Sequence, residues 1–486
     1  MSNISGAIKS IQDIMRKDVG VDGDAQRISQ LVWLFFLKIY DDREVEIELL
    51  EDDYKSPLPE KLRWRNWASD PEGMTGNFLC DFINEELFPT LKENLLLEGP
   101  NRERAQVIHN VFEDTYNYMK SGTLIRQVVN KINEINFNNT EDRHTFGSIY
   151  EQILKDLQSA GNAGEFYTPR AVTQFIVNRV DPQLAESVLD PACGTGGFLA
   201  CTIDHKRKSY VKSAQDEETL INSIHGVEKK ALPHMLCTTN MILHGIDTPI
   251  NIRHANTLSR PYKDYGEKDR VQVIVTNPPF GGIEEDGIEN NFPANFRTRE
   301  TADLFMALIV KLLKTNGRAA VVLPDGFLFG EGTKTRLKQE LLEKCNLHTI
   351  VRLPNGVFNP YTGIKTNILF FTKKPESEQP ATSEVWFYEH PYPEGVISYN
   401  KTKPMRFEEF QAEIDWWCSE ADGFKSRQET EQAWKVSIED IAARNYNLDI
   451  SNPHVGETAV HDPEQLLAAY SQQGSAPPSG VTQEVL

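Results

Sequence analysis

The seven residues TNPPFGG, Thr276 to Gly282, directly follow the apolar run VQVIV. Proline donates no backbone hydrogen bond and fixes its own φ, so Pro278 and Pro279 end a strand and hold the chain rigid. The side-chain oxygen of Asn277 and the main-chain oxygen of Pro278 are two acceptors that suit an NH2 group. Phe280 adds a flat face on which a base can stack. The stretch predicts a site for a flat, amino-bearing ring; a strand-ending turn remains the alternative for NPPF alone.

A glycine-rich turn precedes this stretch, in VLDPACGTGGF from Val188 to Phe198. Gly194, Gly196 and Gly197 allow a tight turn and the close approach of a ligand to the backbone. The spacing is neither the G-x-G-x-x-G of dinucleotide folds nor the Gly-Lys-Ser/Thr of a P-loop. Asp190, at the mouth of the crevice, disfavours a phosphate and favours a cation or hydroxyl groups.

A second acidic residue, Glu228, ends the next apolar segment, in HGVEKK. An acid at this place, after a glycine turn, suits the two ribose hydroxyls of a nucleoside. A solvated surface glutamate is the simpler interpretation of Glu228 alone. Together with Asp190 and the glycines, the ribose role is favoured.

These residues require a sheet whose strand ends bring them together. VQVIV is apolar at consecutive positions, which is typical of a central parallel strand with both faces buried. Helical segments lie between most of the candidate strands, so the alternation predicts an open, doubly wound α/β sheet of the Rossmann-like type. The candidate strands are residues 187–190, 223–228, 251–256, 271–276, 317–324, 348–354 and 366–374.

The regions on either side of this sheet are predicted to be helical. Between residues 4 and 135, apolar side chains such as Ile28, Leu31, Phe35 and Ile39 fall at helical spacing. From residue 401 onward the segments MRFEEFQAEIDWWCSE and ETEQAWKVSIEDIAARNYNLDI are also predicted to be helical. The last stretch, SQQGSAPPSGVTQEVL, has the composition of a flexible tail.

Composition limits the classes of function. The chain has 486 residues and a net charge of −20, so its average surface repels phosphate backbones, and any nucleic-acid contact must be local or supplied by a partner. The longest apolar run, LVWLFFLKIY, is too short to span a bilayer, and the N-terminus lacks a signal-peptide pattern, so a cytoplasmic protein without a membrane partner is expected. The six cysteines have no zinc-type spacing, and no metal is expected.

The motifs together resemble a known family. DPACGTGGF and NPPF, in this order, resemble the cofactor and catalytic motifs of amino-methylating DNA methyltransferases that use S-adenosylmethionine. AGEFYTPR, DLF, GRAAVVLPDGFLF and RLPNGVFNPYTGIKTNILFF resemble further motifs of the adenine-specific group. With the helical N-terminal region and the ending ARNYNLDI, nearly the full chain resembles the modification subunit of Type I restriction–modification systems.

The resemblance implies a domain plan and a site. The plan is an N-terminal helical domain (1–142), an S-adenosylmethionine-dependent methyltransferase domain (143–400), a helical region that contacts the specificity subunit (401–472) and a flexible tail (473–486). Asn277, Pro278, Pro279 and Phe280 would hold the target adenine. The implied cofactor site comprises Glu165, Phe166, Tyr167, Thr168, Pro169, Arg170, Asp190, Gly194, Thr195, Gly196, Gly197, Glu228, Asn256 and Phe305.

Within that set, Thr168 would contact the cofactor carboxylate. Asp190 and the glycine turn would hold the methionine part, and Glu228 the ribose. Asn256 would lie near the adenine ring, on which Phe305 would pack.

The implied reaction is methyl transfer to the N6 amine of an adenine flipped out of double-stranded DNA, protecting host DNA from restriction. Two modification subunits would join one specificity subunit, which reads the sequence, and a restriction subunit can join them; such partners reconcile the function with an acidic chain. Two other functions stay open: methylation of another flat amide, such as a protein glutamine, and a non-catalytic, cofactor-binding scaffold. The former group commonly has tyrosine where this chain has Phe280.

Several surface residues have two interpretations. Trp416, Trp417 and Trp434 either contact the specificity subunit or pack on the chain's own core. The basic residues that are candidates for DNA contact, with an ordinary solvated face as the alternative, are Arg297, Arg299, Lys334 and Arg336.

Overall fold

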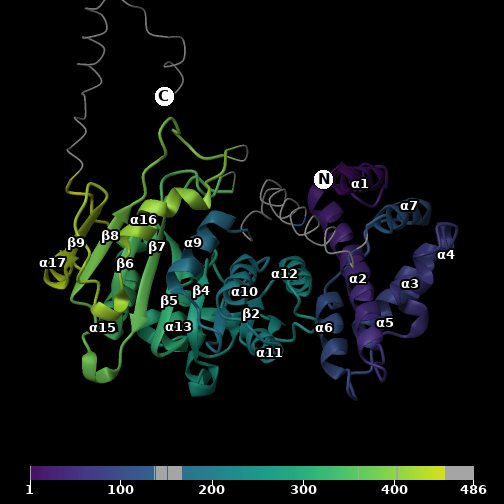
Figure 1. Ribbon diagram of the computed structural model, residues 1–486, viewed down its shortest axis with the longest axis horizontal. Helices are drawn as coiled ribbons and strands as arrows, with labels where there is room; N and C mark the ends of the chain where they lie inside the picture. The colour runs from purple at the N-terminus through teal and green to yellow at the C-terminus, as the bar shows by residue number, and fades with distance from the viewer. Residues whose placement is uncertain are drawn as a thin grey trace, which may run out of the picture.

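The computed structural model describes residues 2–135, 137, 150, 167–359, 361–400 and 403–454. Figure 1 shows two parts side by side, a bundle of N-terminal helices and a mixed α/β part built on one sheet. Residues 455–486 lie outside the described residues. They include the end of the predicted C-terminal helical region and the predicted flexible tail. Among the described residues, no helix combines the length and apolar character needed to cross a membrane.

The N-terminal part is helical, as its periodicity predicts. Residues 31–37 in its longest helix are buried without a break, so this segment of the helix is apolar all round and lies in the core of the bundle. The helices are α1 (Ser2–Met15), α2 (Asp24–Leu50), α3 (Trp64–Trp67), α4 (Gly76–Asp81), α5 (Phe88–Glu93), α6 (Arg102–Phe112) and α7 (Gly122–Ile132).

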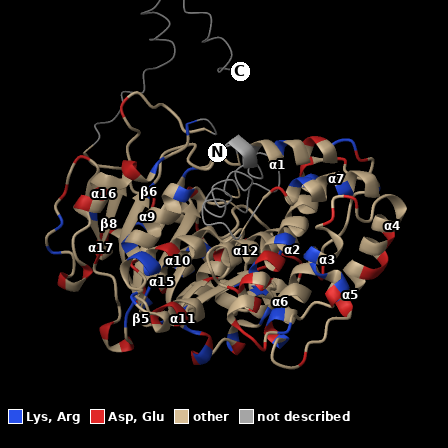
Figure 2. Ribbon diagram, turned by 45° about the vertical axis from the view of Figure 1, so that its right-hand side comes forward, with Lys and Arg blue, Asp and Glu red and all other residues tan. Residues whose placement is uncertain are grey.

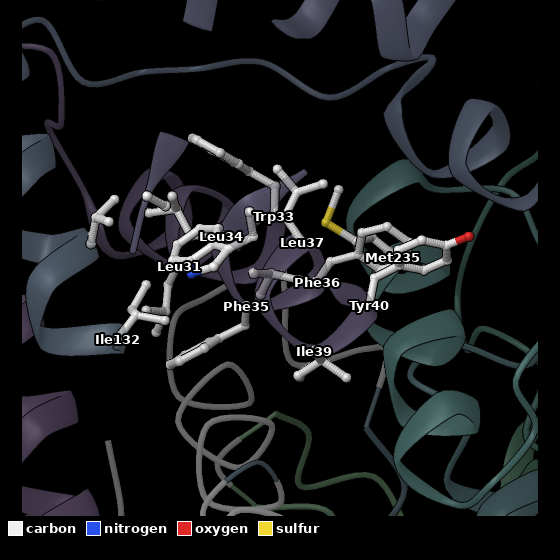
Figure 3. Packing of buried hydrophobic residues seen from close by; sticks show 14 of the residues in the cluster. Leu31, Trp33, Leu34, Phe35, Phe36, Leu37, Ile39, Tyr40, Ile132 and Met235 are labelled. Carbon is white, nitrogen blue, oxygen red and sulfur yellow. The ribbon is translucent and has the colours of Figure 1, made fainter. Parts of the chain in front are cut away.

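One helix of the α/β part completes this core. Met235, Leu236 and Ile242 of α12 (Ala231–Leu243) belong to the same cluster of buried residues as α2. Figure 3 shows Met235 beside the aromatic side chains of α2. Arg43 adds an ion pair to Asp247, with Nε 2.5 Å from Oδ1. The helical bundle is therefore packed firmly against the α/β part.

The sheet has nine strands in the order β3-β2-β1-β4-β5-β7-β6-β8-β9. The strands from β3 to β5 pair in parallel, and β7 is antiparallel to both of its neighbours. The strands are β1 (Val188–Asp190), β2 (Ile224–Glu228), β3 (Ile252–His254), β4 (Val271–Thr276), β5 (Leu313–Pro324), β6 (Cys345–Arg352), β7 (Thr366–Lys373), β8 (Glu384–Glu389) and β9 (Ala433–Ser437). The seven predicted strands and the α/β class are confirmed.

Both faces of the sheet are covered, as the continuous apolar run of β4 predicts. Ile274 belongs to the core beneath one layer of helices, and its neighbours Val273 and Val275 belong to the core beneath the other. The helices of this part, besides α12, are α9 (Arg170–Val180), α10 (Gly197–Ser209), α11 (Ala214–Asn222), α13 (Thr301–Leu312), α14 (Asp325–Phe329), α15 (Thr333–Lys344), α16 (Gln411–Trp416) and α17 (Ile438–Ala443).

The prediction of a purely helical C-terminal region is wrong for one segment. Residues 433–437 form β9, which pairs antiparallel with β8 and extends the sheet edge. The Trp434 ring stacks on Phe387 at 5.4 Å, and this cross-strand pairing outweighs the helical pattern of the flanking residues. Trp417 and Trp434 are buried in the chain's own core, so they offer no surface to a partner.

Candidate functional site

A cavity of about 250 Å³ opens at the carboxyl ends of the first four strands, where ligands bind in open α/β sheets. Its wall comes from the segments after β1, β2, β3 and β4 and from the start of α13. The lining residues are Thr168, Asp190, Pro191, Ala192, Cys193, Gly194, Thr195, Gly197, Phe198, Val227, Glu228, Lys229, Lys230, Ala255, Asn256, Thr257, Asn277, Pro279, Gly282, Ile283, Glu284, Thr301 and Phe305.

The glycine turn joins β1 to α10 through backbone that only glycine adopts readily. Gly194 has φ 52° and Gly196 has φ 82°, both in the left-handed region. A Cβ on Gly196 would lie 2.8 Å from the Sγ of Cys237, in α12. The glycines thus let the turn close on α12 while its backbone faces the cavity.

Two buried carboxylates shape the cavity beside this turn. Glu228 is 6% exposed, and its two oxygens accept the backbone N–H groups of Gly194 (3.0 Å) and Lys230 (2.7 Å). Burial raises the pKa of the Glu228 carboxyl, although those backbone hydrogen bonds act in the opposite sense. The residue predicted to hold ribose hydroxyls therefore also holds the glycine turn in place.

Asp190 lies deeper than its predicted position at the mouth. It is 1% exposed, and its Oδ1 accepts from the hydroxyl of Thr276 (2.6 Å) and the N–H of Ala192 (3.1 Å). Burial raises the pKa of Asp190 to about 7, and the nearby Glu228 adds to the rise. A cationic group bound here would favour the ionised form of Asp190.

The side-chain amide of Asn277 has a hydrogen-bond partner for its nitrogen but none for its oxygen among the described residues. Its Nδ2 donates to the hydroxyl of Thr168 at 3.0 Å, so the amide is oriented. Its Oδ1 is buried and has no hydrogen-bond partner among the described residues. Buried acceptors are nearly always paired in native proteins, so this oxygen, in a residue that lines the cavity, can accept from a donor that a ligand brings.

Phe280, three residues after Asn277, does not line the cavity. Its ring packs edge-on against Phe358, with centroids 5.9 Å apart. It also lines a second, more open hollow of about 800 Å³, shared with Gly282, Asp325 and Ile364. The NPPF stretch thus contributes Asn277 and Pro279 to the cavity and Phe280 to the hollow.

The predicted site residues divide into three groups. Those that line the cavity are Thr168, Asp190, Gly194, Thr195, Gly197, Glu228, Asn256, Asn277, Pro279 and Phe305. Those outside the cavity wall are Tyr167, Pro169, Arg170, Gly196, Pro278 and Phe280. Glu165 and Phe166 lie outside the described residues.

The position of Arg170 has a simple cause. Its guanidinium binds Asp204 of α10, with Nη2 2.8 Å from Oδ2, and this ion pair turns the side chain towards α10. Tyr167, three residues earlier in the chain, is buried in the core of the helical part.

Sequence reasoning missed Glu284, which is 8% exposed and lines the same cavity. Its Oε2 accepts from Lys229 Nζ (3.2 Å) and Asn256 Nδ2 (3.3 Å). The residue reaches the cavity because Glu284 N–H bonds the carbonyl of Arg299 at 3.0 Å, closing a loop whose pairing leaves no local sequence signal.

The four basic residues considered for DNA contact are engaged within the chain. Arg299 pairs with Asp286 at 2.5 Å, and Lys334 pairs with Glu300 and with Asp303. Arg297 and Arg336 each donate to a main-chain carbonyl. These contacts favour the alternative of ordinary surface residues.

The chain matches two family models: N-6 DNA methylase over residues 141–462, and the HsdM N-terminal domain over residues 4–132. It is 66% identical to the methylase subunit of the Type I restriction enzyme EcoEI from Escherichia coli, over 97% of this chain and 94% of the relative. The EcoKI methylase subunit of E. coli K12 is 30% identical, over 87% of this chain and 78% of that relative.

A solved structure has the same fold over nearly the full length. It is the crystal structure of a modification subunit attributed to a type I restriction enzyme of Vibrio vulnificus YJ016, with a TM-score of 0.81 and 43% identity, covering 93% of this chain and 97% of that one. A chain from a structural study of complex assembly in the type I R-M system matches with a TM-score of 0.81 and 34% identity, over 97% of this chain and 95% of that one.

Proposed function

Because the chain belongs to the N-6 DNA methylase family and, within it, to the methylase subunits of Type I restriction enzymes, we propose that it methylates the N6 amine of a flipped-out adenine in double-stranded DNA. The methyl donor is S-adenosylmethionine. The observation that carries this proposal is the buried Oδ1 of Asn277, oriented through Thr168 and without a partner among the described residues. An amine donor from a substrate supplies the missing partner.

The cavity wall fits this cofactor chemically. S-adenosylmethionine carries a sulfonium, an ammonium group and two ribose hydroxyls, and the wall offers the buried carboxylates of Asp190 and Glu228. When bound, the cofactor supplies an activated methyl group. Thr168 and the glycine turn would hold its methionine part, Glu228 its ribose, and Asn256 and Phe305 its adenine.

Asn277 and Pro278 would prepare the amine. The lone pair of adenine N6 is delocalised into the ring, which makes this nitrogen a poor nucleophile. The Oδ1 of Asn277 and the carbonyl oxygen of Pro278 would each accept a hydrogen bond from one N–H of the amine. These two bonds would favour a tetrahedral nitrogen whose lone pair is available. Pro278 and Pro279 keep the acceptors fixed, so positioning supplies much of the rate enhancement.

The target base has to leave the duplex before it reaches Asn277, at a cost of a few kcal/mol. Stacking on Phe280 would return roughly 1–3 kcal/mol of this cost. The hollow of about 800 Å³ that Phe280 lines supports this path, because it offers open space beside the ring on which the base would stack.

The chain's charge supports a partner that reads DNA. Net charge is −20, and Figure 2 shows acidic positions spread over both the helical part and the α/β part. We place two copies of this chain on one specificity subunit, with a restriction subunit able to join, so that partners supply the phosphate contacts and the sequence readout. DNA as the substrate places the protein in the cytoplasm, where the reaction protects host DNA.

The test is transfer of labelled methyl groups from S-adenosylmethionine to DNA, by this chain alone and after mixing with its specificity subunit. We expect label only in the mixture, recovered as N6-methyladenine. Transfer by the chain alone would overturn the partner argument. Absence of transfer by an assembled complex on DNA containing its recognised site would overturn the proposed activity.

A further inference from the structure

The cavity holds a third carboxylate whose role differs from those of Asp190 and Glu228. Glu284 lies in the loop between β4 and α13, and this loop is anchored on both sides of it. An isolated β-bridge pairs Ile283 with Glu300, and the N–H of Thr301 bonds the carbonyl of Gly282 at 3.0 Å. The Glu284 carboxylate is therefore held against the wall by backbone contacts.

Glu284 lies beside Asn256, which follows β3, whereas Asn277 follows β4; the strands β2 and β1 lie between β3 and β4. The glycine turn follows β1, Glu228 ends β2, and Asn256 follows β3, so a nucleoside that extends from the turn past Glu228 brings its base to Asn256. Glu284 contacts Asn256, and its other oxygen is 3.4 Å from the hydroxyl of Thr301, one turn before Phe305.

Hydrogen bonds fix the orientation of the Asn256 amide and therefore which of its atoms faces Glu284. The Oδ1 of Asn256 accepts from the N–H of Leu258 at 2.9 Å, so its NH2 group faces Glu284. That group has two protons, whereas an ionised carboxylate is an acceptor only. The pair offers a donor beside an acceptor, which is the complement of the adenine edge, where N1 accepts and the N6 amine donates.

We propose that Glu284 reads the base of the cofactor: its carboxylate accepts the N6 amine of the cofactor's adenine while Asn256 donates to N1. This inference rests on the proposed function. Lys229, whose Nζ lies 3.2 Å from Glu284 and 2.9 Å from Glu285, contacts the Glu284 carboxylate from the side chain of the residue that follows Glu228. A base with a carbonyl in place of the amine would bring two acceptors together and bind poorly.

The experiment compares two unreactive ligands by calorimetric titration of the full chain: S-adenosylhomocysteine and its deaminated form, S-inosylhomocysteine. The wild-type protein is expected to prefer the adenosyl ligand by roughly 10- to 100-fold, the usual range for leaving a buried charged acceptor unpaired. In Glu284→Gln the amide can donate to the carbonyl, so the ratio should fall. It should not vanish, because the N1–H of the deaminated base still faces the NH2 group of Asn256.

A matched control comes from the neighbouring residue. Glu285 contacts the same Lys229, but its side chain is 74% exposed. Glu285→Gln should keep the wild-type ratio. An unchanged ratio in Glu284→Gln, or equal binding of both ligands by the wild type, would overturn the inference alone. Failure of the wild type to bind either ligand would overturn the proposed function as well.

Discussion

Arg126 in the helical part and Asn277 at the sheet edge both bury polar atoms, but they differ in how many hydrogen-bond partners the chain gives them. The guanidinium of Arg126, on α7, donates to four main-chain oxygens at 2.7–3.1 Å: those of Trp67, Ala68, Asp70 and Met74. The Oδ1 of Asn277 has no partner among the described residues. The contrast suggests an experiment: Arg126 should matter for the stability of the fold, and Asn277, under the proposed function, for the ligand.

The largest expected effect is on catalysis. Asn277→Ala should reduce methyl transfer by about 10²- to 10³-fold or more, the range seen when one preorganised hydrogen-bonding group is removed from a reacting centre. Its free energy of unfolding should change by only about 1 kcal/mol, because the side chain of Asn277 makes one hydrogen bond to the described residues, the bond to Thr168. Rates of the assembled complex and urea unfolding of the chain test both parts; near-normal methylation would remove Asn277 from the mechanism.

Arg126→Met should give the opposite result. Four carbonyls are left without their donor, so we expect the free energy of unfolding to fall by about 3 kcal/mol. Affinity for S-adenosylhomocysteine should be unchanged in the folded protein, because α7 contributes no residue to the cavity. Arg102→Met, at an exposed position, is the control for unfolding. Weaker ligand binding by Arg126→Met without loss of stability would contradict the comparison.

Gly196→Ala lies between these extremes, because it affects both fold and site. The left-handed φ of 82° costs a non-glycine residue about 1–2 kcal/mol, and the new Cβ meets Cys237. We expect a loss of stability of that size and a loss of cofactor affinity of about tenfold. Gly266→Ala, where a Cβ meets nothing within 4 Å, should behave as the wild type. Equal behaviour of the two variants would mean that the turn tolerates a side chain.

The last expected effect needs no change of sequence and is a pH dependence. The pKa of Asp190 is raised to about 7, mainly by burial, so folding favours its neutral form, and its contribution to stability declines as pH rises from about 4 through 7. A cationic cofactor favours the ionised form. Affinity for S-adenosylmethionine should therefore rise between pH 5.5 and 7, by at most about tenfold per unit. Asp190→Asn should lose this slope; a flat wild-type profile would show that Asp190 does not face the cationic part.

Local sequence signals predicted the parts of the site that follow directly from a strand end. Asp190, Glu228 and Asn277 come immediately after apolar runs, and parallel pairing places those ends at one edge. Asp190 shares a hydrogen bond with Thr276, a contact between residues far apart in the chain that the strand register alone produces.

Other parts depend on pairing that no short window contains. Glu284 reaches the cavity only because its loop pairs with Arg299, and its acidic neighbours look equally solvated in the sequence. The strand β9 forms because β8 presents an edge and Phe387 stacks on Trp434. Buried tryptophans in an apparently helical segment do not reveal whether they pack on their own chain or on a partner.

The helix α12 connects the N-terminal bundle to the wall of the cavity. It begins three residues after Glu228, and its far face completes the core around α2. Lys230, whose N–H bonds the Glu228 carboxylate, immediately precedes the helix. Any change in angle between the N-terminal bundle and the sheet must either break the packing of Met235 on α2 or carry the cavity wall with it. As long as that packing holds, the orientation of the bundle and the shape of the cavity near Glu228 are consequently coupled.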